Sequence, residues 1–141
     1  MREKGLTENE KKKIFLRSYL RDKQAVARLE EQLEELRINK MSPSAINSGM
    51  PNGTGLNDLS DYAAKVDELE RELLEKKKDR IESFRKVQTA IEAINEETEK
   101  DLLTYRYLKG MKWEEIAVKM GYSWKHMHRI HSRAIENLKM T

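Results

Sequence analysis

The sequence predicts an all-α protein, with a long antiparallel helical hairpin (coiled coil) followed by a C-terminal three-helix helix-turn-helix module. Charged residues make up 38% of the 141 residues and aromatic residues 6%, and the mean hydropathy is −0.87, which leaves too little apolar material for one compact core. Both prolines, Pro43 and Pro51, fall within one short stretch. Apolar seams at helical spacing run on either side of that stretch.

Residues 1–40 are expected to form the first coiled-coil helix. From about Thr7 to Asn39 the chain contains no glycine or proline and is dense in good helix formers. Apolar residues recur there at spacings of three, four and three: Val26, Leu29, Leu33 and Leu36. This spacing is typical of an a/d seam. Residues 41–60 then combine Ser, Asn, Gly and Pro with little charge, which favours a flexible linker.

Residues 61–96 are expected to form the second coiled-coil helix, with Asp58 or Asp61 as its N-cap. It carries one seam of Tyr62, Val66, Leu69 and Leu73, and another of Phe84, Val87, Ile91 and Ile94. The two seams do not share a heptad register, so we expect a stutter between Glu75 and Arg80. The spacing leaves two arrangements open, a hairpin closed within one chain or a homodimer formed through the coiled coil.

Residues 97–141 change to three short helical units that are separated by Gly110 and Gly121. Counting from Trp113, the fifth residue, where two crossing helices touch, is the small Ala117, and the ninth, which must accept a left-handed turn, is Gly121. The offsets that should be apolar are filled by Ile116, Met120, Tyr122, Met127 and Ile130. Ser123 is a suitable N-cap for the last helix. This set of spacings predicts a helix-turn-helix.

The same region is basic. Residues 101–141 hold eight Lys and Arg against four acidic residues, whereas the remaining hundred residues sum to −1. Lys125, Arg129 and Arg133 recur every four residues and so share one face of the last helix, opposite the side that buries its apolar residues. The helix is therefore expected to bind double-stranded DNA in the major groove.

The residues expected to contact DNA lie along this exposed face and at its N-terminal end: Ser123, Trp124, Lys125, His126, His128, Arg129, Ser132 and Arg133. Arg129 suits a bidentate contact to guanine, while Lys125 and Arg133 suit either a base or a phosphate. Ser123 and the helix N-terminus suit a phosphate. For Trp124 two roles stay open, stacking on a thymine methyl or sugar and covering the turn.

Other function classes find little support in the sequence. His126, His128 and His131 do not converge on one helical side, so we expect no metal site and no cofactor. No catalytic motif is present, and we expect that the protein is not an enzyme. The absence of cysteine excludes disulfides and agrees with a reducing cytoplasm. No apolar run is long enough for a membrane span, so we expect a cytoplasmic protein without a membrane partner.

The stretch from Asp101 to Leu138 resembles region 4 of the sigma-70 family. The elements that carry the resemblance are, in chain order, Arg106-Tyr107, Gly110, Glu115-Ile116-Ala117, Gly121 with Ser123, and Arg133-Ala134-Ile135 with Leu138. The resemblance implies that the last helix reads a −35-like promoter element. It also implies a contact with RNA polymerase, because region 4 binds the flap of the β subunit.

The whole chain is also similar to small sigma region 4-like proteins of Firmicute phages and integrated elements, including the ArpU-type phage transcription regulators. The sequence has no counterpart of region 2, the sigma segment that melts the −10 element. We therefore expect an accessory activator or half of a split sigma factor. Two alternatives stay open: a coiled-coil interaction module that binds RNA polymerase or another protein, and a small phage packaging subunit that forms a ring.

Overall fold

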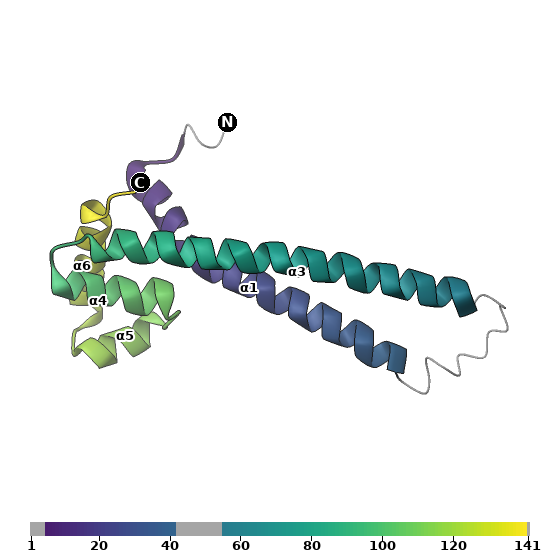
Figure 1. Ribbon diagram of the computed structural model, residues 1–141. Coiled ribbons are helices and arrows are strands. Elements are labelled where there is room, and N and C mark those ends of the chain that lie inside the picture. Colours follow the sequence, from purple (N-terminus) through teal and green to yellow (C-terminus); the bar gives the residue numbers. More distant parts are fainter. Residues whose placement is uncertain (1–4, 42–54, 141) are drawn as a thin grey trace. The chain divides into compact units, whose positions relative to one another are not determined.

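The computed structural model describes residues 5–41 and 55–140, and within them every regular element is helical (Figure 1). The all-α prediction is confirmed. The elements are α1 (Glu8–Met41), α3 (Gly55–Glu92), α4 (Glu97–Leu103), the π-helical segment η2 (Thr104–Leu108), α5 (Trp113–Met120) and α6 (Trp124–Asn137). None of the described helices has an apolar stretch long enough to cross a bilayer.

Both long helices differ slightly from their predicted bounds. The backbone N–H of Glu10 donates to Thr7 Oγ1, and the N–H of Thr7 donates to Glu10 Oε2, each at 3.1 Å, so a capping box begins α1. Most of the expected linker lies outside the described residues, but α3 already begins at Gly55, before the expected N-cap. Between Gly55 and Gly110 the chain contains no proline and no other glycine, and a helix extends readily once it is nucleated.

The chain forms two compact units, and both long helices contribute to each of them. Unit 1 consists of Met1–Asp22 together with Arg80–Thr141, and unit 2 consists of Lys23–Asp79. The C-terminal module therefore does not begin as a compact body at residue 97. It is completed by the start of α1 and the end of α3, which the sequence pattern had assigned to the coiled coil.

Unit 2 is an antiparallel pair of helices that closes within one chain. Its small core consists of Leu29, Leu33 and Leu69, with Leu36, Val66 and Leu73 packed against them. Arg37 Nη2 lies 3.1 Å from Glu70 Oε2, and Lys77 Nζ lies 3.9 Å from Glu30 Oε2. Residue numbers thus rise along one helix while they fall along the other, as in a hairpin. The predicted seams do pair with each other.

The predicted stutter in the second helix stays a prediction, because burial fits a register with it and a register without it. Spacings of three and four connect the buried and half-buried Val66, Leu69, Leu73, Lys76, Arg80, Ser83, Val87 and Ala90 of α3. Lys77, Phe84 and Ile91 are also buried or half-buried, as a stutter after Leu73 would place them. Polar residues occupy the middle of this register. Lys and Arg can lay their aliphatic stems along apolar surface, and Ser83 Oγ donates to the carbonyl oxygen of Arg80 at 3.2 Å. Polar side chains therefore fill the seam between the two apolar stretches of α3.

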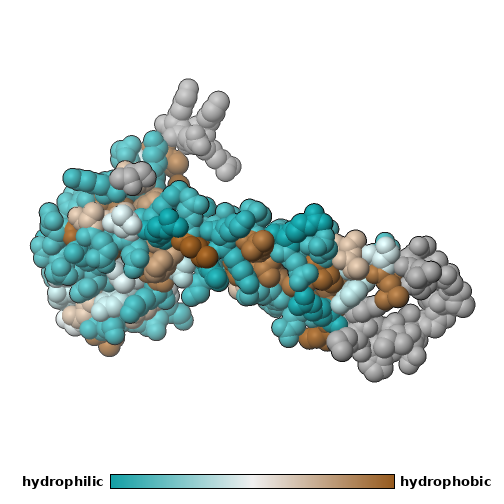
Figure 2. Space-filling view, in the orientation of Figure 1, coloured by the Kyte–Doolittle hydropathy of each residue, from teal (hydrophilic) through white to brown (hydrophobic). Residues whose placement is uncertain are grey.

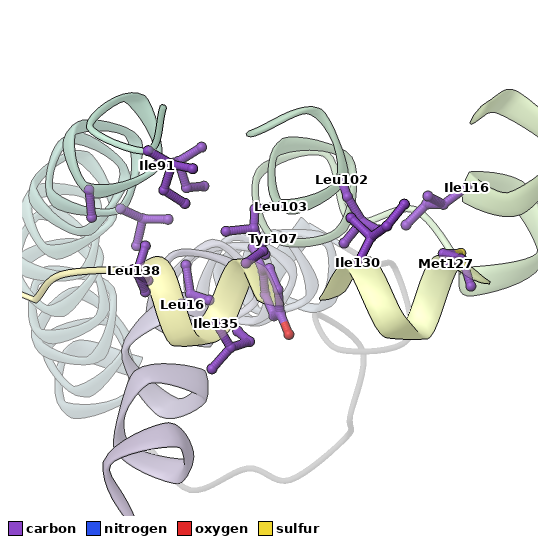
Figure 3. Packing of buried hydrophobic residues seen from close by; sticks show 14 residues of the cluster. Leu16, Ile91, Leu102, Leu103, Tyr107, Ile116, Met127, Ile130, Ile135 and Leu138 are labelled. Atoms are coloured by element: carbon purple, nitrogen blue, oxygen red, sulfur yellow. The ribbon is translucent and has the colours of Figure 1, made fainter. Parts of the chain in front are cut away.

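The core of unit 1 gathers around α6 (Figure 3), and Met127 and Ala134 of this helix are fully buried. In Figure 3 Ile116 and Met127 lie near one end of α6, and Leu16, Ile135 and Leu138 lie near the other. The rest of this core comes from Ile130 of α6, from α3, α4 and η2, and from the segment between α3 and α4: Val87, Ala90, Ile91, Ile94, Leu102, Leu103 and Tyr107. Burial of one side of α6 leaves its opposite side facing solvent.

The turn between α5 and α6 has the geometry that a helix-turn-helix requires. Gly121 has φ 71°, ψ 32°, in the left-handed region, and the backbone N–H of Tyr122 donates to the carbonyl oxygen of Ala117 at 3.0 Å. Ser123 then begins α6, because its Oγ accepts a hydrogen bond from the backbone N–H of His126 at 3.2 Å. Glycine and serine fix the crossing of the two helices.

Replacing this glycine tests the turn. Gly121→Ala should lower the free energy of unfolding by about 1–2 kcal/mol, because a Cβ is strained at this φ. A Cβ at Gly121 would meet no atom within 4 Å, so the loss has no packing component. Urea denaturation followed by circular dichroism gives the change. Gly5→Ala, where a Cβ also meets nothing and φ is not positive, should have little effect. Equal stabilities for all three proteins would contradict this account.

Candidate nucleic-acid interface

The exposed face of α6 carries four of the predicted contact residues. Lys125, Arg129, Ser132 and Arg133 are all exposed, while Met127, Ile130 and Ala134 are buried on the other side of the helix. In the described part of the chain no carboxylate forms an ion pair with Lys125, Arg129 or Arg133. The face is thus positively charged and open to a polyanion.

Ser123 and Trp124 lie at the N-terminal end of this face. The first turn of α6 contains no acidic residue, so no side chain there neutralises the positive end of the helix dipole. This end can therefore receive a phosphate. Trp124 is 52% exposed, and its ring centroid lies 4.5 Å from that of His128, one turn further along α6. The indole packs against a residue of its own helix, and about half of the residue's surface remains exposed to solvent.

The three histidines lie in different environments. His126 is half-buried, with its ring edge-on to Tyr122 at a centroid distance of 4.7 Å. His128 is half-buried, and its ring packs against those of Trp113 and Trp124. His126 and His128 were both predicted to contact DNA, and both are less accessible than the exposed residues of α6. His131 is buried. Among the described residues no three potential ligand side chains are arranged to share a metal ion.

His131 joins α6 to η2. Its Nε2 lies 2.7 Å from the hydroxyl oxygen of Tyr107 in a buried hydrogen bond. Burial, followed by the charges of Lys13, His128, Arg106 and Arg17, lowers the pKa of His131 from 6.5 to about 4. Burial also raises the pKa of the Tyr107 hydroxyl. At neutral pH this is therefore a pair of uncharged partners inside the core.

A second group of basic residues beside α6 was not predicted from the sequence. Arg106 places its guanidinium carbon 4.4 Å from the centroid of the Trp113 ring, and its Nη1 donates to the carbonyl oxygen of Met111 at 3.0 Å. Lys13 and Arg17 of α1 line a pocket with it. We call this the cationic pocket, and its lining residues are Lys13, Arg17, Arg106, Tyr107, Trp113, His128 and His131. The basic residues near the start of α1 could have indicated this pocket, but the sequence analysis assigned that segment to the coiled coil.

A second hollow lies on the other flank of α6. Its lining residues are Glu96, Thr98, Glu99, Tyr122, His126, Ile130 and Arg133. Glu99 is buried, and its Oε1 accepts a hydrogen bond from Asn137 Nδ2 at 2.8 Å. At 100° per residue the flank with His126 and Ile130 is roughly opposite the flank with His128 and His131. The two flanks of α6 therefore differ in charge.

Comparison with known proteins agrees with this geometry. Residues 96–140 match the family model described as Sigma-70, region 4. Neither the curated proteins nor the solved structures contain a significant match to the chain. The matched segment spans α4, η2, α5 and α6, so this part of the chain is a sigma region 4-like helix-turn-helix. The match supports DNA binding and a role in transcription regulation.

The buried histidine makes the fold sensitive to acid. The pKa of His131 is about 4 in the folded chain and 6.5 when unfolded, so between those pH values the unfolded state binds the extra proton. The free energy of unfolding should therefore fall as the pH is lowered from about 6.5 to about 4, by roughly 2–3 kcal/mol from this group. Urea titrations at several pH values measure it.

Two variants separate His131 from other titrating groups. His131→Gln, which cannot titrate, should flatten the pH dependence in this window, whereas His126→Gln, which leaves His131 in place, should keep it. An equally steep acid dependence in His131→Gln and the unsubstituted protein would contradict the assignment.

Proposed function

We propose that the protein is a sequence-specific, sigma-factor-like transcription regulator that reads a −35-type promoter element with α6. The observation that carries the proposal is the exposed basic face of α6, on a helix-turn-helix whose other side is held in the core. We propose that the protein comes from a phage or mobile element and works in the cytoplasm. Its action is binding alone, since the sequence carries no catalytic motif.

The exposed residues divide into two roles on the DNA. Arg129 lies near the middle of the outward face, where a guanidinium can bind O6 and N7 of one guanine. Lys125 and Arg133 lie one turn before and one turn after it and reach toward phosphates. Phosphate contacts supply affinity and set the register, while the base contact supplies specificity.

RNA polymerase is the proposed partner. The likeness to sigma-70 is confined to region 4, at residues 96–140, so this sequence offers a promoter reader without a matched melting region. A protein of this kind acts on transcription by recruiting or retaining, at the promoter, an RNA polymerase that depends on another factor. We therefore propose an accessory role.

Selection of bound sites from random duplexes, with and without RNA polymerase, should yield a defined motif. On that site Arg129→Ala should lose about 1–3 kcal/mol of binding free energy and relax the preference at one base pair. The matched control is Arg28→Ala on an exposed position of unit 2, which removes the same charge and should bind like the unsubstituted protein. Sequence-blind binding by the unsubstituted protein, or an intact preference in Arg129→Ala, would argue against this function.

A second candidate function is protein docking by unit 2, either to RNA polymerase or to a second copy of the chain. Its helical pair leaves Ile38 57% and Leu74 56% exposed, and two shallow grooves along the pair include Leu36, Leu69 and Leu73. Figure 2 shows apolar patches interrupting the hydrophilic surface of the two long helices. A two-helix pair whose apolar seam is only partly covered suits a helical partner.

A double substitution tests this docking surface. Ile38→Glu with Leu74→Glu alters exposed positions only, so the fold should persist while capture of purified RNA polymerase, or a dimer mass in light scattering, is lost. Gln24→Glu, also on unit 2, adds a single negative charge away from these apolar positions and should change neither readout. Unchanged capture and unchanged mass in the double variant would exclude docking through this surface.

A further inference from the structure

We propose that the cationic pocket of unit 1 is a phosphate-binding site, and that α1 completes it with Lys13 and Arg17. The occupant that we infer is a backbone phosphate of the DNA whose groove holds α6, so the proposal rests on the proposed function. It adds a contribution from residues that lie outside the segment similar to region 4.

The charge of the lining is one-sided. Lys13, Arg17 and Arg106 line the pocket, and no carboxylate is among its lining residues. In the described part of the chain none of these three cations forms an ion pair with a carboxylate. Like charges that converge without a counter-charge repel each other, and a bound anion removes that repulsion.

A buried polar atom points to the same ligand chemistry. His128 Nε2 is inaccessible to solvent and has no hydrogen-bond partner, although nearly all such atoms in proteins have one. The ring lies between Trp113 and Trp124, which fix its plane. Because His128 lines the cationic pocket, a small shift of its ring would let this nitrogen, when it carries the proton, donate to a phosphate oxygen there.

The pocket is already shaped for its ligand. Arg106 is held by the carbonyl oxygen of Met111 and by the Trp113 ring, so its remaining N–H groups have a fixed direction. The cavity measures about 210 Å³, enough for one phosphate group. Beside the pocket, burial lowers the pKa of His131 most, and the positive charges of Lys13, Arg106 and Arg17 lower it further.

The position of the pocket explains why the phosphate would come from DNA. When a helix lies in the major groove, the sugar–phosphate backbones of both strands pass along its two flanks. The cationic pocket lies on the flank of α6 that carries His128 and His131, whereas the opposite hollow is lined by Glu96 and Glu99. The first flank carries no carboxylate, whereas the second places two of them beside Arg133, so the first flank suits a phosphate better, and this contact would also set the orientation of α6 in the groove.

Removal of the α1 charges is the direct test. Arg17→Gln and Lys13→Gln should each weaken binding to all duplexes alike, and should reduce the slope of log affinity against log salt by about 0.9. Arg85→Gln is the matched control, because Arg85 is exposed on α3 of the same unit and does not line the pocket. Circular dichroism verifies that each variant is folded.

A second arm uses inorganic phosphate and follows the imidazole resonances of His128 and His131 by NMR. Phosphate should shift them in the unsubstituted protein and in Arg85→Gln, but less in Arg17→Gln and Lys13→Gln. DNA binding with the same salt slope in all four proteins would overturn the DNA-phosphate assignment and leave the proposed function standing.

Failure of the unsubstituted protein to bind any duplex would instead overturn the proposed function, and with it DNA as the source of the phosphate. The phosphate arm would then decide whether the pocket binds anions. Resonances that phosphate does not move would overturn the site itself.

Discussion

Burial of the apolar side of α6 is the interaction on which the rest of the structure depends. Met127 and Ala134 are fully enclosed, and this fixes the rotation of the helix about its own axis. Because helical residues have fixed angular positions, the same rotation determines that Lys125 and Arg129 face solvent. The direction of the exposed basic face is therefore a result of core packing. A helix with the same basic residues and a looser core would present no defined surface to a groove.

Structure that depends on neighbouring residues was predicted from the sequence far better than packing between distant segments. The turn was predictable because Ala117 and Gly121 satisfy steric requirements that act between near neighbours. The contribution of α1 to unit 1 was not, since the burial of Leu16 depends on packing against segments more than sixty residues away. Apolar periodicity also gave no sign of the burial of Ser83, a polar residue on α3.

Charge and aromatic rings are organised together around the module. Trp113 contacts Arg106 on one side and His128 on another, so one indole orients both a permanent cation and a titratable ring. His131 is neutral at physiological pH because its surroundings are buried and positive. The flank of α6 that faces this cluster differs from the flank that contains Glu96 and Glu99. The charge around α6 is therefore asymmetric.

The core of unit 1 joins segments from opposite ends of the sequence, with consequences for how the molecule folds. Leu16 and Leu138 share one core, and Lys12 Nζ donates to the carbonyl oxygen of Glu136 at 3.1 Å, across a sequence separation of 124 residues. Contacts this distant raise the contact order and slow folding, because a long loop must close before they form. During synthesis, the start of α1 must wait until α6 has left the ribosome. Residues 96–140 thus form a recognisable stretch of sequence whose core is shared with both long helices.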